Sequence, residues 1–235
     1  MKHMDTTIKR IVIYVFGLFF LALGIAFSIQ AMLGVSPVSS LAYALSLITG
    51  FSVGMMTFLA NILYIIVQVI LNKSVEVKEY IVQLIVTVMF SFFIDGALII
   101  VGLLPAPEGL VMQLVFLLIS LFIVSIGLLG YFSSKFPLMP YDALTYSISK
   151  RFKLQFAKAK ITSDLTNVTV AALICLIFIH SFGSIGIGTF VAAYFIGKIT
   201  GMLIKRFQQP LLSWVYKTKN EEVEQKYALK ETTTN

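Results

Sequence analysis

Six long apolar segments constrain the fold of this chain more than any other feature of its sequence. They cover residues 11–32, 53–71, 80–104, 110–132, 161–179 and 185–204. Each reaches or approaches the roughly 20 residues that an α-helix needs to cross about 30 Å of hydrocarbon. The segments are continuously apolar, whereas the strands of an outer-membrane barrel alternate between apolar and polar residues. The sequence therefore predicts an all-α polytopic membrane protein with six transmembrane helices.

The composition agrees with this class. Apolar residues make up 58% of the chain and charged residues 12%, whereas soluble domains carry about 25% charged residues. The first apolar segment is longer than the core of a signal peptide and is not followed by a small-residue cleavage site. We therefore expect it to be retained as a span.

The basic residues predict the orientation of the spans. Seventeen of the eighteen Lys and Arg residues lie within residues 1–10, 72–79, 133–160 and 205–235. These are alternate connections, and the connections between them contain no basic residue. The positive-inside rule then places both termini in the cytoplasm. Topology and contact with anionic lipid headgroups explain the net charge of +7, so no nucleic-acid partner is expected.

A segment that begins at Gly34 is repeated, with changes, 103 residues later at Pro137. The matched pairs are Pro37 and Pro140, Leu41 and Leu144, Tyr43 and Tyr146, Ser46 and Ser149, and, upstream, Gly24 and Gly127. The spans that precede the two copies are expected to run in opposite directions. Residues 11–104 and 110–206 are therefore interpreted as inverted three-helix repeats, flanked by cytoplasmic tails over residues 1–10 and 207–235. Several secondary transporters have this architecture, with the substrate site between the repeats.

Each copy of the repeated segment predicts a short helix after the first span of its half. Ser36 is a good N-cap residue, Pro37 fits the first helical position and Gly50 follows the last one. A helix over residues 37–49 is only about 20 Å long, so it either enters the membrane as a re-entrant helix or lies on its surface. The same two alternatives hold for the second helix, over residues 140–150, which carries Asp142 in its first turn.

The short helices supply candidate binding residues. A helix N-terminus has unpaired N–H groups and a partial positive charge, so Ser36, Ser39 and Ser40 could hold an anion or a polar headgroup there. The alternative is that these serines only cap and pack helices. Tyr43 and Tyr146 either line a site or anchor the chain at the membrane interface.

Ionisable and amide residues within the spans are further candidates, because a charge near the bilayer centre costs at least about 2.5–3.5 kcal/mol. Asp95 is expected to lie deep in the third span. It could pair with Lys198, unless Lys198 extends to the headgroups instead. Asp164 is matched by Asn61 in the other half, and Lys160 lies one helical turn before Asp164, where the two can pair.

Residue types typical of catalysis are scarce. His3 and His180 are the only histidines and Cys175 is the only cysteine, so a histidine-based triad or a cysteine metal cluster cannot be assembled. We expect no enzyme activity, no cofactor and no metal site. Gly186 and Gly188 are interpreted as sites of close helix packing, and Gly197 and Gly201 as a further small-residue packing pair.

Five short motifs are distributed over the two halves: Leu-Ala-Leu-Gly-Ile-Ala at residues 21–26, Gly-Val-Ser-Pro-Val-Ser-Ser at 34–40, Phe-Ile-Asp at 93–95, Phe-Ala-Lys-Ala-Lys-Ile at 156–161 followed by Asp164, and Gly-Ile-Gly-Thr at 186–189. In this combination, the chain resembles the YczE/YyaS/YitT-like family of bacterial integral membrane proteins. The resemblance implies a multi-pass protein of the bacterial inner membrane. The second short helix departs from the family pattern because it carries Tyr141, Asp142 and Ala143 where a glycine is often found.

The leading functional hypothesis is a transporter of a small solute that binds between the two repeats. Proton coupling through Asp95 or Asp164 is part of this hypothesis. The alternative is a non-transporting membrane scaffold, or an accessory or S-component-like binding subunit. The sequence leaves the substrate, the coupling ion and the oligomeric state open.

Overall fold

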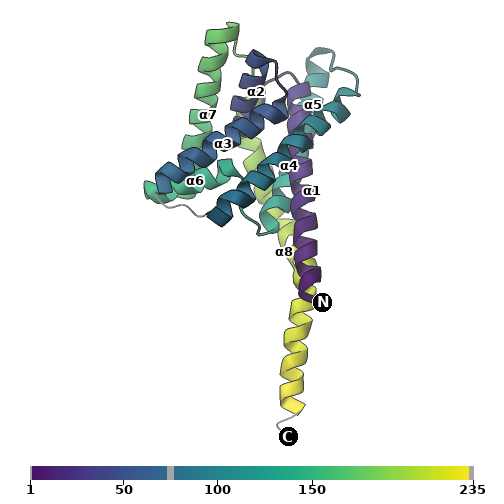
Figure 1. The fold of residues 1–235 in the computed structure, drawn as a ribbon. Coiled ribbons are helices and arrows are strands. Elements are labelled where there is room, and N and C mark those ends of the chain that lie inside the picture. The colour runs from purple at the N-terminus through teal and green to yellow at the C-terminus, as the bar shows by residue number, and fades with distance from the viewer. Residues whose placement is uncertain (1, 73–76, 233–235) are drawn as a thin grey trace.

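The computed structural model describes residues 2–72 and 77–232, and its side chains over residues 6–72 and 77–216. The described residues form eight helices and no strand. The helices are α1 (Lys2–Gln30), α2 (Pro37–Thr49), α3 (Val53–Asn72), α4 (Val77–Gly102), α5 (Gly109–Ser133), α6 (Pro140–Arg151), α7 (Phe156–Ile179) and α8 (Ile187–Thr232). The start of α1 and the second half of α8 lie at the same end of the bundle (Figure 1).

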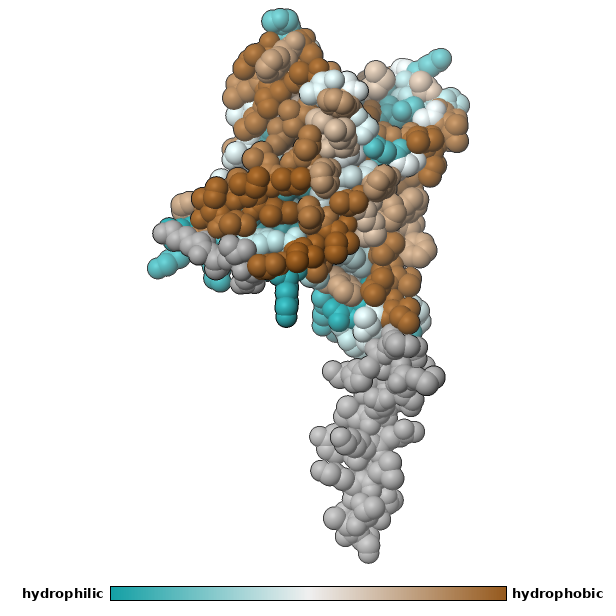
Figure 2. All heavy atoms as spheres, viewed as in Figure 1, coloured by the Kyte–Doolittle hydropathy of each residue, from teal (hydrophilic) through white to brown (hydrophobic). Residues whose placement is uncertain are grey.

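Six of these helices are long and apolar enough to cross a membrane: α1, α3, α4, α5, α7 and the first part of α8. Many of their large apolar side chains point outward; Phe92 on α4, for example, is 74% exposed. Figure 2 shows apolar residues over most of the visible face of the bundle. Such a surface is favourable in a bilayer and not in water. The chain is therefore a multi-pass membrane protein, as the sequence predicts.

The helix α2 has the predicted bounds because proline and glycine delimit it. Pro37 occupies its first turn, and Gly50 ends it in the left-handed conformation with φ 74°. Ser46 Oγ then donates to Phe51 O over 2.7 Å, and its counterpart Ser149 Oγ donates to Leu154 O over 2.8 Å. The two short helices thus end in the same way, at positions that the sequence repeat matches.

Packing partners also recur between the two halves. The helices α1 and α5 pack closely against each other. In addition, α1 packs on α4 as α5 packs on α8, and α2 packs on α7 as α3 packs on α6. A Cβ atom on Gly24 would meet Val124, and one on Gly127 would meet Leu21. Gly24 is matched to Gly127 by the repeat, and Leu21 is matched to Val124. Each contact is therefore the counterpart of the other, as expected for contacts across a two-fold axis. That the halves are inverted across a membrane stays a prediction.

The crossing of α1 and α5 depends on glycines. A Cβ on Gly17 would lie 2.6 Å from Tyr131 N, and one on Gly127 would lie 2.6 Å from Leu21 N. Small residues let helix backbones approach in this way, and close packing is a main source of helix association in membranes. Gly34 and Gly186 form a second close contact, between the connections that precede α2 and α8. Gly197 and Gly201 do not follow the prediction, since a Cβ on either would meet no atom within 4 Å.

Asp95 has a structural position that the sequence did not predict. It lies in the last two turns of α4, where Oδ1 accepts from Gly54 N over 2.8 Å and Oδ2 accepts from Ser52 Oγ over 2.7 Å. A carboxylate here satisfies a free N–H group at the start of α3 and interacts favourably with the helix dipole. The Asp95–Lys198 pair does not form, and the exposed Lys198 Nζ instead lies 5.6 Å from the centre of the Tyr194 ring.

The C-terminal segment, which the sequence analysis predicts as a tail, is helical. The helix α8 continues through Pro210 to Thr232. Near its middle it contacts the start of α1. Lys9 Nζ donates to Trp214 O over 3.3 Å and lies 5.1 Å from the centre of the Trp214 ring.

We predict that Gly127→Ala destabilises the protein, because the new methyl group would meet the backbone of α1. Overpacking of this kind costs about 1–3 kcal/mol. The measurement is the thermal unfolding midpoint in detergent. The matched control is Gly96→Ala on α4, where a Cβ would meet nothing within 4 Å. Equal midpoints for the two variants would contradict the close crossing of α1 and α5.

We also predict that Asp95→Ala lowers the unfolding free energy by about 1–2 kcal/mol, since it removes a cap from α3. Asp95→Asn keeps one acceptor oxygen and should lose less. The same thermal measurement distinguishes these variants. A stability of Asp95→Ala equal to that of the unmodified protein would show that the carboxylate does not support α3.

Candidate functional site

A cavity of about 440 Å³ lies between the two halves, and all eight helices contribute to its lining. We call it the central cavity. Most of its lining is apolar, from residues such as Leu21, Phe90 and Val124. Its polar lining residues are Ser36, Ser39, Thr57, Asn61, Tyr64, Tyr141, Asp142, Lys160, Asp164 and Thr200. An apolar pocket with a few convergent polar groups is the usual form of a small-molecule site.

A charged cluster occupies one part of the lining. Lys160 Nζ lies 3.3 Å from Asp164 Oδ1 and 3.4 Å from Asp142 Oδ1. The pairing of Lys160 with Asp164 agrees with the sequence analysis, whereas Asp142 is brought from α6 by the fold. The three side chains are 16–29% exposed. Two carboxylates share one ammonium group, so the cluster has a formal charge of −1.

Tyr141 joins this cluster from α6. Its hydroxyl donates to Asp164 Oδ1, and Lys160 Nζ lies 4.2 Å from the centre of its ring. Burial, and then the charge of Asp164, raise the pKa of Tyr141 above that of an exposed phenol. The phenol therefore keeps its proton and acts as a donor to Asp164.

A second polar chain links the cluster to α2. The rings of Tyr141 and Tyr64 pack edge to face, with their centres 5.3 Å apart. Tyr64 Oη donates to Asn167 Oδ1 over 2.7 Å. Asn167 Nδ2 then donates to Pro37 O over 2.6 Å. Tyr64 and Asn167 are themselves separated by 103 residues, which is the offset of the sequence repeat. Repeat-matched residues that touch each other mark the position of a local two-fold axis.

Two buried polar groups in the lining have no partner. Asn61 is 4% exposed and Thr200 is 6% exposed. Asn61 Nδ2 and Thr200 Oγ1 are among the buried atoms of the described side chains that make no hydrogen bond. Such atoms are uncommon in folded proteins and call for an explanation. Both atoms lie in the wall of the central cavity, where water or a ligand can reach them.

The first turn of α2 contributes hydroxyl groups. Ser36 is the N-cap residue, although its side chain makes no capping bond. Its Oγ lies 3.1 Å from Ser39 Oγ, and both residues line the central cavity. Ser40 does not line it, because Ser40 Oγ donates to Pro37 O over 2.8 Å within the buried side of the helix.

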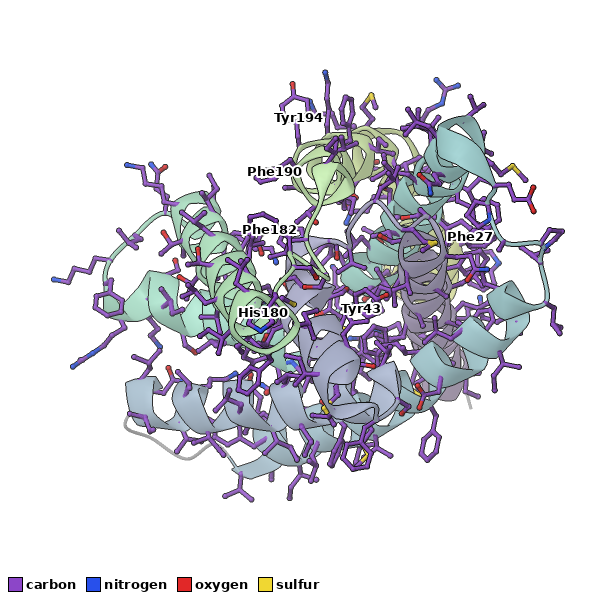
Figure 3. The ribbon with its side chains drawn as sticks, turned by 90° about the horizontal axis from the view of Figure 1, so that it is seen from above. Phe27, Tyr43, His180, Phe182, Phe190 and Tyr194 are labelled. Atoms are coloured by element: carbon purple, nitrogen blue, oxygen red, sulfur yellow. The ribbon has the colours of Figure 1, made fainter. Side chains whose placement is uncertain are left out.

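Besides Ser40, four other sequence candidates lie outside the cavity lining: Asp95, Lys198, Tyr43 and Tyr146. Tyr43 packs against the core around α1, and Tyr146 is 56% exposed. Figure 3 shows Tyr43 within the bundle and Tyr194 on the outer side of α8. The described residues contain no group of three His, Cys, Asp or Glu side chains that could hold a metal ion.

Tyr64, Tyr141 and Thr200 line the cavity but were not predicted as site residues from the sequence. The first could have been found from its match with Asn167 at the repeat offset. Tyr141 stood out only as a departure from the family pattern. Nothing in the sequence distinguishes Thr200 from other threonines in apolar helices, because only the packing of α8 leaves its hydroxyl without a partner.

The chain is similar in sequence to two bacterial proteins. The chain is 30% identical over 207 residues to "Uncharacterized protein YyaS" of Bacillus subtilis, which covers 88% of the chain and 96% of that protein. It is 24% identical over 191 residues to an uncharacterized protein of Haemophilus influenzae, with 81% of each chain covered. No solved structure matches the chain significantly.

The model of one protein family matches residues 8–205, which overlap all six candidate spans. The resemblance to YyaS-like proteins is thereby confirmed. The chain belongs to the family of unknown function DUF6198.

Proposed function

We propose that this chain is a transporter of a small solute in the bacterial inner membrane, with its binding site in the central cavity between two inverted repeats. The observation that carries the proposal is the unpartnered amide of Asn61 in the cavity lining. A buried donor without a partner costs about 1–3 kcal/mol. A ligand that accepts its hydrogen bond recovers this free energy on binding.

The arrangement around the cavity supports transport over simple binding. Every helix contributes to the lining, so a movement of one half against the other would reshape the site. Tyr64 and Asn167 connect the halves at the local axis, where a rocking motion would need the least displacement. Transporters built from inverted repeats move in this way around a site at the repeat interface.

Within this proposal, we place the proton-coupling role on Asp164. Asp164 lines the cavity beside Lys160 and Tyr141, whereas Asp95 is used as a cap for α3. A carboxylate that lies in a cavity next to a lysine and a phenol is suited to gain and lose a proton as access changes.

We predict that Asn61→Leu raises the stability of the ligand-free protein by about 1 kcal/mol, because it removes an unsatisfied donor. Asn167→Leu is the matched control. Asn167 is also buried but is fully bonded, so its loss should destabilise the protein. The measurement is the thermal midpoint of purified protein, alone and with a panel of amines, amino acids, organic acids and sugars.

A compound that stabilises the unmodified protein should fail to stabilise Asn61→Leu, and the same compound should cross the membrane of proteoliposomes that contain the unmodified protein. If no compound stabilises the protein and a stable partner protein co-purifies with it, the scaffold alternative replaces transport.

We further predict that the termini are cytoplasmic. In a Cys175→Ala background, a membrane-impermeant thiol reagent should label Glu108→Cys in intact cells. It should label Lys150→Cys only after permeabilisation. Both positions are exposed in the structure, so the difference reports the side of the membrane and not burial. The opposite labelling pattern would invert the topology.

A further inference from the structure

One packed helix pair within the first half has no packed counterpart within the second. The helices α3 and α4 pack against each other, but their counterparts α7 and α8 do not form a packed pair among the described residues. In Figure 3 the connection that carries Phe182 joins the two helices from above, and α8 stands apart from α7. The position that a close helix contact occupies in the first half is therefore open in the second.

The face of α8 at this opening belongs to the central cavity. Ala193, Gly197 and Gly201 follow one another at intervals of four residues, and all three line the cavity. Ala193 and Gly197 are nevertheless exposed, and no atom lies within 4 Å of a Cβ built on Gly197 or Gly201. One edge of the cavity therefore lies at the outer surface of α8.

The surroundings of this opening are apolar. On α7, Ile161 is 67% exposed and Leu165 is 65% exposed. On α8, Phe190 is 69% exposed, and Figure 3 shows its side chain on the outer side of the helix. Side chains of this kind face hydrocarbon in a bilayer. In a bilayer, side chains of this kind would place lipid next to the opening.

Inside the opening, the polar groups are placed for one kind of ligand. The unpartnered Thr200 hydroxyl lies on α8 beside Gly201, and the unpartnered Asn61 amide lies on α3. The charged cluster of Asp142, Lys160 and Asp164 has a formal charge of −1, and these are the only charged side chains among the described residues that line the cavity. A ligand with a positively charged group could bind the carboxylates through that group. Its apolar remainder could then pack against the apolar part of the cavity lining.

We propose that the central cavity takes a cationic amphiphile, an alkyl- or arylammonium compound, which enters from the bilayer between α7 and α8. This inference rests on the proposed function because it assumes that the cavity is the binding site. It adds the chemical class of the substrate and its route of entry.

The test uses four probes with the full-length protein in lipid nanodiscs: decylamine, decanol, decanoate and butylamine. Decylamine should raise the thermal midpoint more than decanol or decanoate of equal chain length, because only the amine is positively charged. Its apparent affinity should follow its mole fraction in the lipid when the lipid concentration is varied. Butylamine, which partitions weakly into lipid, should have little effect at the same total concentration.

Variants then locate the effect. Gly197→Phe should fold, since no atom lies within 4 Å of a Cβ there, and should abolish the decylamine shift by filling the opening. Gly96→Phe, at another helical glycine without a neighbour within 4 Å and outside the cavity lining, should retain the shift. Asp164→Asn should weaken decylamine at least about tenfold, the loss expected for a hydrogen bond to a charged group.

Three results would overturn the inference: equal shifts for the three ten-carbon probes, an unchanged decylamine shift in Gly197→Phe, or an affinity that follows the aqueous concentration alone. If a water-soluble compound stabilises the protein and loses this effect in Asn61→Leu while decylamine is inactive, the proposed transport site stands and the amphiphile is rejected. If no compound of either kind binds, both proposals fail.

Discussion

The crossing of α1 and α5 is the contact on which the rest of the structure depends. Glycines let the two backbones touch, and Gly24 and Gly127 make equivalent contacts with Val124 and Leu21. Since lipid tails are as apolar as the side chains, close packing here must replace the hydrophobic effect that joins helices in water. The crossing fixes the relation of the two halves, and the short helices α2 and α6 then pack on α7 and α3 of the opposite half. The central cavity is the space that this exchange leaves.

Polar groups in the described chain fall into two kinds. Many are satisfied within the fold, as where Asp95 caps α3 and Asn167 binds Pro37 O. In the cavity, by contrast, Asn61 and Thr200 keep free hydrogen-bonding atoms. Because water in a hydrocarbon environment cannot routinely supply partners, such atoms reduce stability unless a ligand compensates. The hydroxyls of Thr87, Ser133 and Ser163 also lack a partner, but these residues do not line the cavity. The proposed site therefore rests on the position of Asn61 and Thr200 in the cavity wall.

Local sequence rules were sufficient for the helices and insufficient for the site. Proline and glycine gave the bounds of α2, apolar length predicted the spans, and the four-residue spacing predicted the Lys160–Asp164 pair. The addition of Asp142 to this pair, the use of Asp95 as a cap and the open face at Gly197 depend on which helices become neighbours. Hydropathy and spacing do not encode such neighbours, because each span is compatible with several packing partners.

The central claim is that the cavity between the halves opens in turn to both sides of the membrane. It is tested most directly by the reaction of Asn61→Cys, in a Cys175→Ala background, with a small membrane-impermeant thiol reagent applied to right-side-out and to inside-out vesicles. The account predicts reaction from both faces, because Asn61 lies in the lining of the cavity. Reaction from one face only, or from neither, would contradict alternating access and leave a static membrane protein.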